Sequence, residues 1–245
     1  MVKIWIMARL FLIPNLLGDS PWQQVIPSFN AGVIEAISCF IVEDVRNARR
    51  FLKKIHPLAE PDKLHFFELN KHTSFEEKKS FLAPLLRGHD TGLLSEAGCP
   101  GIADPGAEIV RMAHESGIRV VPLVGPSSIL LALMASGLNG QDFAFNGYLP
   151  VKQADRVRTI RQLERNALSL GQTQIFIETP YRNNQLIADL LRTCQPETYL
   201  CIAANLTLEN ETILTNRVFF WKKNVPFMEK VPVVFLLGGS AFPEH

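Results

Sequence analysis

The feature that most constrains this sequence is a strand, a tight loop and a helix start within residues 92–106. An apolar run leads into a turn rich in Gly and Pro, and a helical pattern follows. Pro105 suits the first helical position and Asp104 the N-cap, because the first amides of a helix need acceptors. Gly98 and Gly101 lack side chains, so the backbone there could lie against a ligand. The pattern predicts either a ligand loop at a strand end or an ordinary connection that needed small residues to turn.

Length and charge set wide limits. The chain has 245 residues, of which 47% are apolar, enough for one large domain or two of ordinary size. It carries 25 basic and 24 acidic side chains, for a net charge of +1. Binding of a nucleic acid would therefore need a local basic patch.

The four cysteines are widely scattered. Cys39 and Cys201 fall in expected strands, so we predict buried thiols in a reducing compartment, with neither a disulfide framework nor a zinc site. The six histidines show no metal-site spacing, so no metal is expected.

The first half of the chain alternates between short apolar runs and helical patterns. Continuous apolar strands separated by helices indicate a mostly parallel sheet covered on both faces. The expected strands are residues 10–13, 39–42, 64–67, 91–94 and 119–123, and the expected helices are residues 47–55, 74–86 and 107–115.

The second half repeats this alternation and then changes. Its late strands follow one another with no room for a helix, so antiparallel pairing is expected there. The expected strands are residues 143–148, 174–177, 200–203, 218–221 and 233–237, and the expected helices are residues 127–136, 154–168 and 183–193. We therefore predict an α/β fold of two layered domains, residues 1–124 and 125–245, with the site in a cleft between them.

Several nucleotide-binding and hydrolase patterns are absent from the sequence. It has no Gly-x-Gly-x-x-Gly, no P-loop ending in Gly-Lys-Ser/Thr and no Gly-x-Ser-x-Gly elbow. Without the glycine pattern, the sequence offers little support for binding of a dinucleotide such as NAD.

Five ordered motifs resemble one branch of the tetrapyrrole methylase superfamily, typified by 16S ribosomal RNA ribose 2′-O-methyltransferases. Residues 95–106, S-E-A-G-C-P-G-I-A-D-P-G, are similar to that branch's S-D-A-G-T-P-x-I-x-D-P-G. Residues 41–46, 120–128, 145–150 and 175–182 resemble its A-E-D-T-R, V-V-P-L-P-G-P, E-G-F-L-P and I-F-Y-E-S-x-H-R motifs in the same order. The likeness runs from about residue 10 to residue 239.

The resemblance implies two α/β/α domains and a methyltransferase that uses S-adenosylmethionine. The family's cofactor contacts, carried over position by position, fall at the first strand end, in the central loop and at later strand ends. They are Pro14, Leu17, Gly98, Cys99, Pro100, Ile102, Ser127, Ser128, Glu178, Asn205, Leu206 and Pro232.

The catalytic candidates are Glu43, Asp44 and Arg46, which follow the second expected strand. Transfer to a ribose hydroxyl requires removal of its proton, and a carboxylate within hydrogen-bond reach would serve. Arg46 would hold a carboxylate or an RNA phosphate. The alternative is that the three residues cap the next helix and pair among themselves.

The densest basic cluster comprises Lys152, Arg156, Arg158, Arg161 and Arg165. Arg158, Arg161 and Arg165 share one helical face, which would track a phosphate backbone or simply be a solvated face.

Departures from the family leave the acceptor open. Glu96 replaces an aspartate and Cys99 a threonine, while Asn205 and Leu208 replace a carboxylate and a lysine. We expect methylation of ribosomal RNA. The alternatives are methylation of a tetrapyrrole-like small molecule and a non-catalytic module that binds the cofactor.

The location of the protein and its self-association are further expectations. Arg9 interrupts the apolar start and no small-residue cleavage site follows, so a signal peptide is not expected. No apolar run approaches the length of a membrane helix. We expect a cytoplasmic homodimer without a membrane partner.

Overall fold

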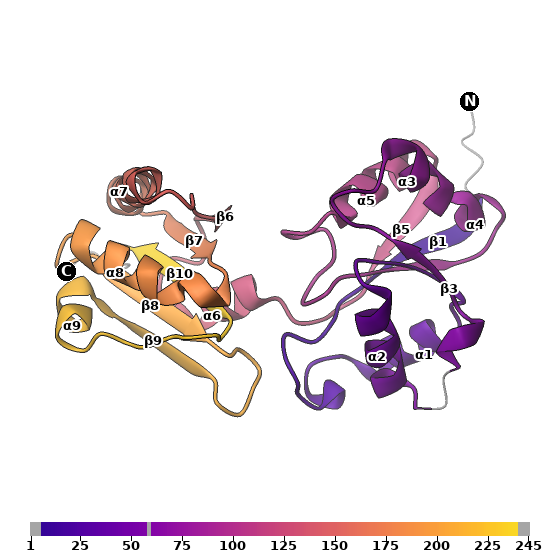
Figure 1. Ribbon diagram of the computed structural model, residues 1–245, viewed down its shortest axis with the longest axis horizontal. Helices are drawn as coiled ribbons and strands as arrows, with labels where there is room; N and C mark the ends of the chain where they lie inside the picture. Colours follow the sequence, from indigo (N-terminus) through magenta and orange to yellow (C-terminus); the bar gives the residue numbers. More distant parts are fainter. Residues whose placement is uncertain (1–5, 58–59, 240–245) are drawn as a thin grey trace. The chain divides into compact units, whose positions relative to one another are not determined.

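The computed structural model describes residues 6–57 and 60–239. Residues 1–5, the start of the apolar run on which the signal-peptide expectation rests, lie outside the described residues. The chain forms two compact units, Met1–Ser127 and Ser128–His245, each with its own five-stranded sheet (Figure 1).

The first unit holds a parallel sheet in the order β3-β2-β4-β1-β5. Its strands are β1 (Ile6–Ile13), β2 (Cys39–Val42), β3 (His65–Glu68), β4 (Thr91–Leu94) and β5 (Ile118–Pro122). Its helices are α1 (Ser28–Glu35), α2 (Val45–Ile55), α3 (Phe75–Phe81), α4 (Ala83–Leu86) and α5 (Gly106–Glu115). Because β1 lies between β4 and β5, the loops that follow these three strands meet at one edge of the sheet.

Two apolar clusters cover the two faces of this sheet. One packs α1 and α2 against side chains such as Phe11 and Phe40, and the other packs α3, α4 and α5 against Leu10 and Ile41. Figure 1 shows α1 and α2 on one side of these strands and α3, α4 and α5 on the other. The predicted parallel sheet with covered faces is confirmed.

The second unit holds a mixed sheet in the order β6-β7-β10-β8-β9. Its strands are β6 (Phe143–Tyr148), β7 (Thr173–Ile177), β8 (Tyr199–Ala204), β9 (Thr212–Arg217) and β10 (Val233–Gly238). Strands β6 and β7 are parallel, whereas β10 is antiparallel to β7 and β8, and β9 to β8. The predicted antiparallel pairing of the late strands is therefore confirmed.

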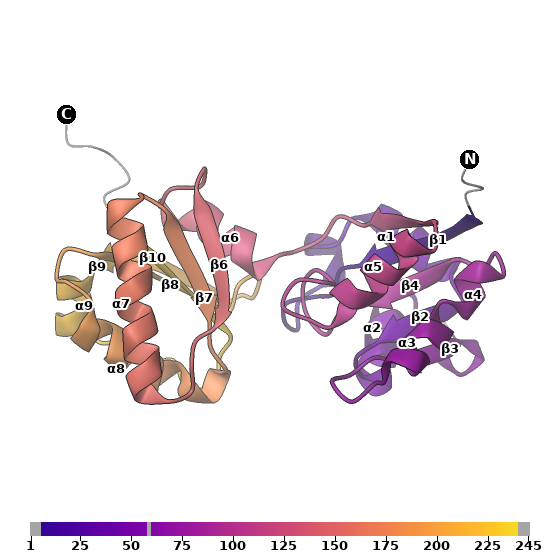
Figure 2. The same ribbon diagram turned by 90° about the horizontal axis from the view of Figure 1, so that it is seen from above.

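The helices of this unit are α6 (Ser128–Ser136), α7 (Gln153–Ser169), α8 (Asn183–Thr193) and α9 (Val218–Lys223). The α7, α8 and α9 helices share one core with Phe176 and Phe235 of the sheet. Figure 2 shows the long α7 helix beside these strands.

One strand prediction is wrong. Residues 218–221, an aromatic run with high strand propensity, belong to α9, and the strand is β9 just before it. Val218 and Trp221, three residues apart, are both buried on one face of α9. Polar β9 pairs along the whole of β8, so tertiary pairing overrides propensity there.

Helix boundaries also differ from the prediction. The single helix expected at residues 74–86 is two helices, because Pro84 lacks an amide proton and the chain turns at Leu82. The α1 helix was not predicted, since Asn30 and Gly32 weaken its helical pattern. The α5 helix begins at Gly106, one residue later than Pro105 suggested.

The cysteine prediction is confirmed for burial. Cys39, Cys194 and Cys201 are buried, Cys99 is half-buried, and all four are free thiols. Among the described helices, none has the length and apolar character that a bilayer crossing needs.

Candidate active site

Three loops of the first unit are joined behind the carboxyl ends of β1, β4 and β5. The Asn15 amide donates to Gly98 O at 2.9 Å, and the Gly98 amide donates to Asn15 O at 3.2 Å. This isolated antiparallel bridge ties the loop after β1 to the central loop after β4.

The side chain of Asn15 strengthens this junction. Its buried Nδ2 donates to Ser95 O at 3.0 Å and to Glu96 O at 3.1 Å, while its Oδ1 accepts from the Leu16 amide at 2.7 Å. Ser95 Oγ in turn donates to Gly98 O at 2.7 Å. Sequence reasoning missed Asn15, although an asparagine directly after a buried strand often bonds to nearby backbone.

Two glycines are required by this arrangement. Gly98 has φ of +69°, which side chains rarely adopt, and a Cβ there would lie 3.3 Å from Leu17 Cδ2. A Cβ at Gly125 would lie 2.3 Å from Cβ of Pro14, whose ring cannot move aside. The backbone of the third loop therefore lies directly against the loop after β1.

The third loop is also fixed by side chains. The Cys99 thiol donates to Pro126 O at 3.5 Å, and burial raises its pKa, which keeps the donor proton in place. Asn30 Nδ2 of α1 donates to Val124 O at 2.8 Å. Sequence reasoning missed Asn30, because its helix was not predicted.

The structure thus gathers the cofactor candidates of the first unit. The first loop carries Pro14 and Leu17, and the joined central loop carries Gly98, Cys99, Pro100 and Ile102, of which only Ile102 is exposed. Ser127 ends the first unit and Ser128 begins α6 in the second unit.

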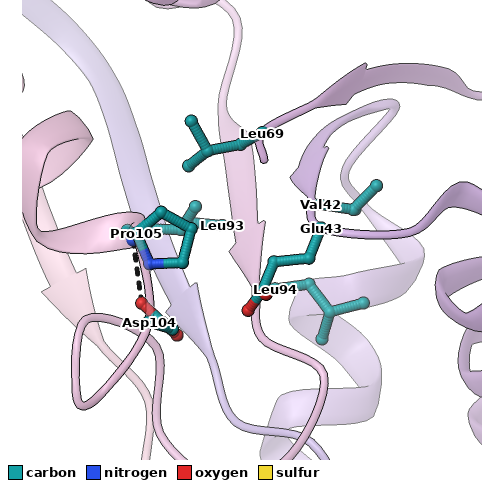
Figure 3. A pocket seen from close by; sticks show the side chains of 8 residues that line it. Val42, Glu43, Leu69, Leu93, Leu94, Asp104 and Pro105 are labelled. Carbon is teal, nitrogen blue, oxygen red and sulfur yellow. Dashed lines mark hydrogen bonds between the residues drawn. The ribbon is translucent and has the colours of Figure 1, made fainter. Parts of the chain in front are cut away.

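A small acidic pocket lies beside the central loop. It has a volume of about 10 Å³, room for about one water molecule. Its lining includes Glu43 after β2 and Asp104 before α5. Figure 3 shows both carboxylates on the same side of the pocket, with Leu69 opposite.

Burial and like charge change the acidity of this pocket. Burial, then the charge of Asp104 and then that of Glu96, raise the pKa of Glu43, while a backbone hydrogen bond from Glu96 opposes the shift. Burial also raises the pKa of Asp104. Its Oδ1 accepts from the amides of Gly101 at 2.7 Å and Gly106 at 2.8 Å. The N-cap of α5 is Pro105 rather than the predicted Asp104, whose carboxylate instead joins the central loop to the start of the helix.

The other two catalytic candidates have different surroundings. Asp44 is exposed and caps α2, with Oδ1 accepting from the Asn47 amide at 2.8 Å. Arg46 is exposed and forms no ion pair with any residue that the structure describes. The predicted capping role is therefore present at Asp44. Of the three catalytic candidates, only Glu43 lines the pocket.

Glu178 follows β7 at one edge of the second sheet. Its Oε1 accepts from the Thr179 amide at 2.6 Å and from Arg182 Nε and Nη2 at 3.0 and 2.6 Å. The side chain is 1% exposed, and its Oε2 has no hydrogen-bond partner among the described residues. An unpaired buried acceptor costs about 1–3 kcal/mol, so this atom is suited to a ligand donor.

The turn after β8 lies at the same edge. Asn205 and Thr207 have φ of +54° and +71°, and such a φ is an outlier for the β-branched Thr207. The Asn205 amide donates to Pro232 O at 3.1 Å, and Thr207 Oγ1 is a second buried atom without a described partner. The candidates Asn205, Leu206 and Pro232 are thus together, one strand away from Glu178.

The basic cluster on α7 divides in two. Arg158, Arg161 and Arg165 are exposed, as their shared face predicts. Arg156 is wrongly grouped with them, because it is buried and pairs with buried Asp189 at 2.7 Å. Its position on the inner face of α7 excludes it from a phosphate-binding surface.

Comparison with protein families identifies the chain. The family Tetrapyrrole (Corrin/Porphyrin) Methylases matches residues 31–219. The chain belongs to the tetrapyrrole methylase family. It is accordingly a methyltransferase that uses S-adenosylmethionine as methyl donor.

Its curated relatives include bacterial enzymes named ribosomal RNA small subunit methyltransferase I. The enzyme of Escherichia coli O157:H7 is 30% identical over 240 residues, which cover 97% of this chain and 80% of the relative. The enzyme of Vibrio cholerae is 32% identical over 204 residues, 83% of this chain and 67% of the relative.

Solved structures support the fold. The methyltransferase CobJ superposes with a TM-score of 0.61 at 17% identity, covering 98% of this chain and 96% of CobJ. Uroporphyrin III C-methyl transferase from Thermus thermophilus superposes with a TM-score of 0.58 at 15% identity, covering 94% of this chain and 97% of that enzyme. The predicted two-sheet α/β architecture of this methyltransferase is confirmed. No group of three His, Cys, Asp or Glu side chains suited to a metal ion occurs within residues 6–57 and 60–239.

Proposed function

We propose that this methyltransferase methylates a ribose 2′-hydroxyl of ribosomal RNA, with Glu43 as the general base. The observation that carries the proposal is the half-buried Glu43 carboxylate, whose pKa is raised beside a water-sized pocket. A hydroxyl group is about as large as the water that this pocket admits. The RNA small-subunit names of the relatives support the choice of acceptor.

The cofactor candidates fit S-adenosylmethionine. In the first unit, Gly98 and Gly125 let the loops after β1, β4 and β5 pack directly against one another, so the candidates on these loops keep a fixed arrangement for a ligand. In the second unit, Glu178 Oε2 offers an unpaired acceptor for a ribose hydroxyl or an exocyclic amine. We propose that these residues, with the other candidates named from the sequence, bind the cofactor.

The chemistry asks little of the protein beyond position and proton removal. Bound S-adenosylmethionine supplies an electrophilic sulfonium methyl group. Glu43 would accept the proton of the 2′-hydroxyl while the ribose oxygen takes the methyl group and the sulfur–methyl bond breaks, which leaves the neutral thioether S-adenosylhomocysteine. The joined loops around Gly98 hold the reactants in one orientation, which provides much of the acceleration. Asp104 and Glu96 raise the basicity of Glu43.

The deciding experiment fractionates the acceptor. The protein is incubated with tritiated-methyl S-adenosylmethionine and either ribosomal RNA or a small-molecule extract. We expect label in RNA that is recovered as 2′-O-methylated nucleosides. Label only in the small-molecule fraction would instead support a tetrapyrrole-like acceptor. Label in neither fraction, with cofactor binding intact by calorimetry, would support a non-catalytic module.

Self-association is a separate proposal. The α6 helix has no charged residue, and Met134 and Leu130, one turn apart, are 78% and 50% exposed. We propose that this face joins two copies of the chain in a homodimer. A Met134→Glu variant should elute as a monomer in light-scattering chromatography, while an already monomeric wild type would reject the idea. We also propose that the protein works in the cytoplasm, because its cysteines are free thiols and the proposed acceptor is ribosomal RNA.

A further inference from the structure

Two exposed aromatic rings of the second unit have no role in the core or in the site described above. Tyr181 is 81% exposed and Phe227 is 76% exposed, the highest values for aromatic rings in the described part of the chain. Exposed apolar side chains that gather on one surface often mark a site where another molecule binds.

The two rings stand on segments that are bonded to each other. Tyr181 lies in the short 3-10 helix Pro180–Arg182, and Phe227 lies between α9 and β10. The Lys230 amide donates to Pro180 O at 3.3 Å, and the Met228 amide donates to Asn184 Oδ1 at 2.8 Å. These bonds lie on both sides of Tyr181, so the surface keeps its shape without a ligand.

Three lysines lie on the chain segment that carries Phe227. The exposed segment at residues 222–230 carries Lys222, Lys223 and Lys230 against a single acid, Glu229. None of the three lysines forms an ion pair with a described residue. The Lys223 ammonium lies 5.9 Å from the centre of the half-exposed Phe219 ring.

Free cations interleaved with exposed rings fit single-stranded nucleic acid. Aromatic rings stack on unpaired bases, and lysines neutralise the phosphates between them. A paired RNA helix keeps its base faces hidden. Surfaces that bind proteins are depleted of lysine, whereas this one is rich in it.

We propose that Tyr181 and Phe227 form a stacking platform for unpaired bases of the RNA substrate, with Lys222, Lys223 and Lys230 neutralising its phosphates. The proposal rests on the RNA acceptor proposed above. The related branch has histidine where this chain has Tyr181. The platform would thus give this chain a larger stacking ring than its relatives.

The test is fluorescence anisotropy of the full chain with a labelled, unstructured RNA of about twelve nucleotides. Stacking contributes enough that Tyr181→Ala with Phe227→Ala should weaken binding about tenfold or more, with an unchanged salt slope. Tyr181→Phe with Phe227→Tyr keeps both rings and should bind like the wild type. Phe29→Ala with Phe75→Ala removes two exposed rings of the first unit and should have no effect.

The lysines should affect the salt dependence of RNA binding. Replacing Lys222, Lys223 and Lys230 with Ala should reduce the slope of log affinity against log salt by about 2, or about 0.7 for each phosphate contact. Because all these side chains are exposed, the melting temperature should stay that of the wild type.

The outcomes separate this proposal from the proposed function. If the double alanine variant binds unpaired RNA as tightly as the wild type while the wild type methylates RNA, the platform is wrong and the function stands. If the variant instead loses self-association, the surface joins two copies of the chain and the platform is wrong. If the wild type neither binds nor methylates RNA, both proposals fail.

Discussion

Neighbouring carboxylates at residues 43 and 44 are used in different ways. Asp44 is exposed and its oxygen caps the first turn of α2. Glu43 faces the acidic pocket, where burial and two further carboxylates raise its pKa. We therefore expect Glu43 to accept the proton and Asp44 to have a structural role.

The first prediction concerns Glu43→Gln. The amide keeps the shape of the side chain but cannot accept the proton, so kcat should fall about 100- to 10,000-fold. Cofactor affinity, measured by calorimetry, should not change. Asp44→Ala is the matched control, and it should cost about 1 kcal/mol of unfolding free energy with kcat little changed, because only a cap is lost. Full activity in Glu43→Gln would remove Glu43 as the base.

The second prediction concerns pH. Glu43 works as a base only when ionised, so kcat should fall as the pH drops through its raised pKa, above the ordinary value of about 4.3. Asp104→Asn removes one charge that raises this pKa but keeps the Oδ1 that caps Gly101 and Gly106. The acid limb of the kcat profile should then move to lower pH. An unmoved limb would show that Asp104 does not act on the base.

The same shift has a consequence for stability. A raised carboxyl pKa favours the folded state below the ordinary pKa, and this contribution is lost as the pH rises through the raised value. The ionised Glu43 therefore weakens the fold at neutral pH. Glu43→Gln should raise the melting temperature more at pH 8 than at pH 4, which calorimetry can measure. An equal change at both pH values would contradict this.

At the scale of single elements, α7 carries one buried arginine on its inner face and three exposed arginines on its outer face. Arg156 turns inward, where its Nη1 donates to Pro150 O at 3.2 Å and Val151 O at 2.7 Å and fixes the connection from β6. Arg158, Arg161 and Arg165 face solvent. Arg158 pairs with half-buried Asp155 at 3.0 Å, an interaction that water and salt screen. The outer face remains available to an RNA backbone.

The third prediction reverses this outer face. Replacing Arg158, Arg161 and Arg165 with Glu should weaken RNA binding strongly and flatten its salt dependence, since fewer counterions are released. Cofactor affinity should stay unchanged. The matched control reverses exposed Arg87, Arg111 and Arg119 of the first unit, with the same change in total charge. Equal losses in both variants would assign the effect to net charge, and unaltered binding would remove this helix from RNA recognition.

At the scale of the whole molecule, the chain consists of two units with separate apolar cores. The second core surrounds a buried ionic group. Asp189 of α8 accepts from Arg156 Nε at 2.8 Å, from Gln153 Nε2 at 3.0 Å and from Arg192 Nη2 at 2.5 Å. Removal of one partner leaves a buried charge without compensation, at a cost of about 3–5 kcal/mol.

The fourth prediction follows from this separation. Asp189→Ala should accelerate amide hydrogen exchange throughout the second sheet and leave the first sheet unchanged, because the two cores share no side chains. Asp155→Ala, which removes a half-buried acid at the start of the neighbouring helix α7, should alter exchange in neither sheet. Accelerated exchange in both sheets would show that the units unfold as one.

The sequence by itself determined the family and most of the order of elements, except for α1, β9 and α9. Periodicity and turn residues are local properties, so β2, β4, β6 and α8 were predicted with the bounds that the structure gives them. Five motifs in the family's order identified the methyltransferase family, because most of their residues match even where single polar positions have changed.

Only the tertiary structure decided which residues meet. Asn15 and Asn30 bind backbone that lies 80 and 94 residues away, and no local pattern signals such a partner. The burial of Arg156 depended on Asp189 in another helix, and β9 became a strand because β8 offered it a partner. The difference between Glu43 and Asp44 arose in the same way, since distant Asp104 and Glu96 change the electrostatics around one carboxylate while the other only caps its own helix.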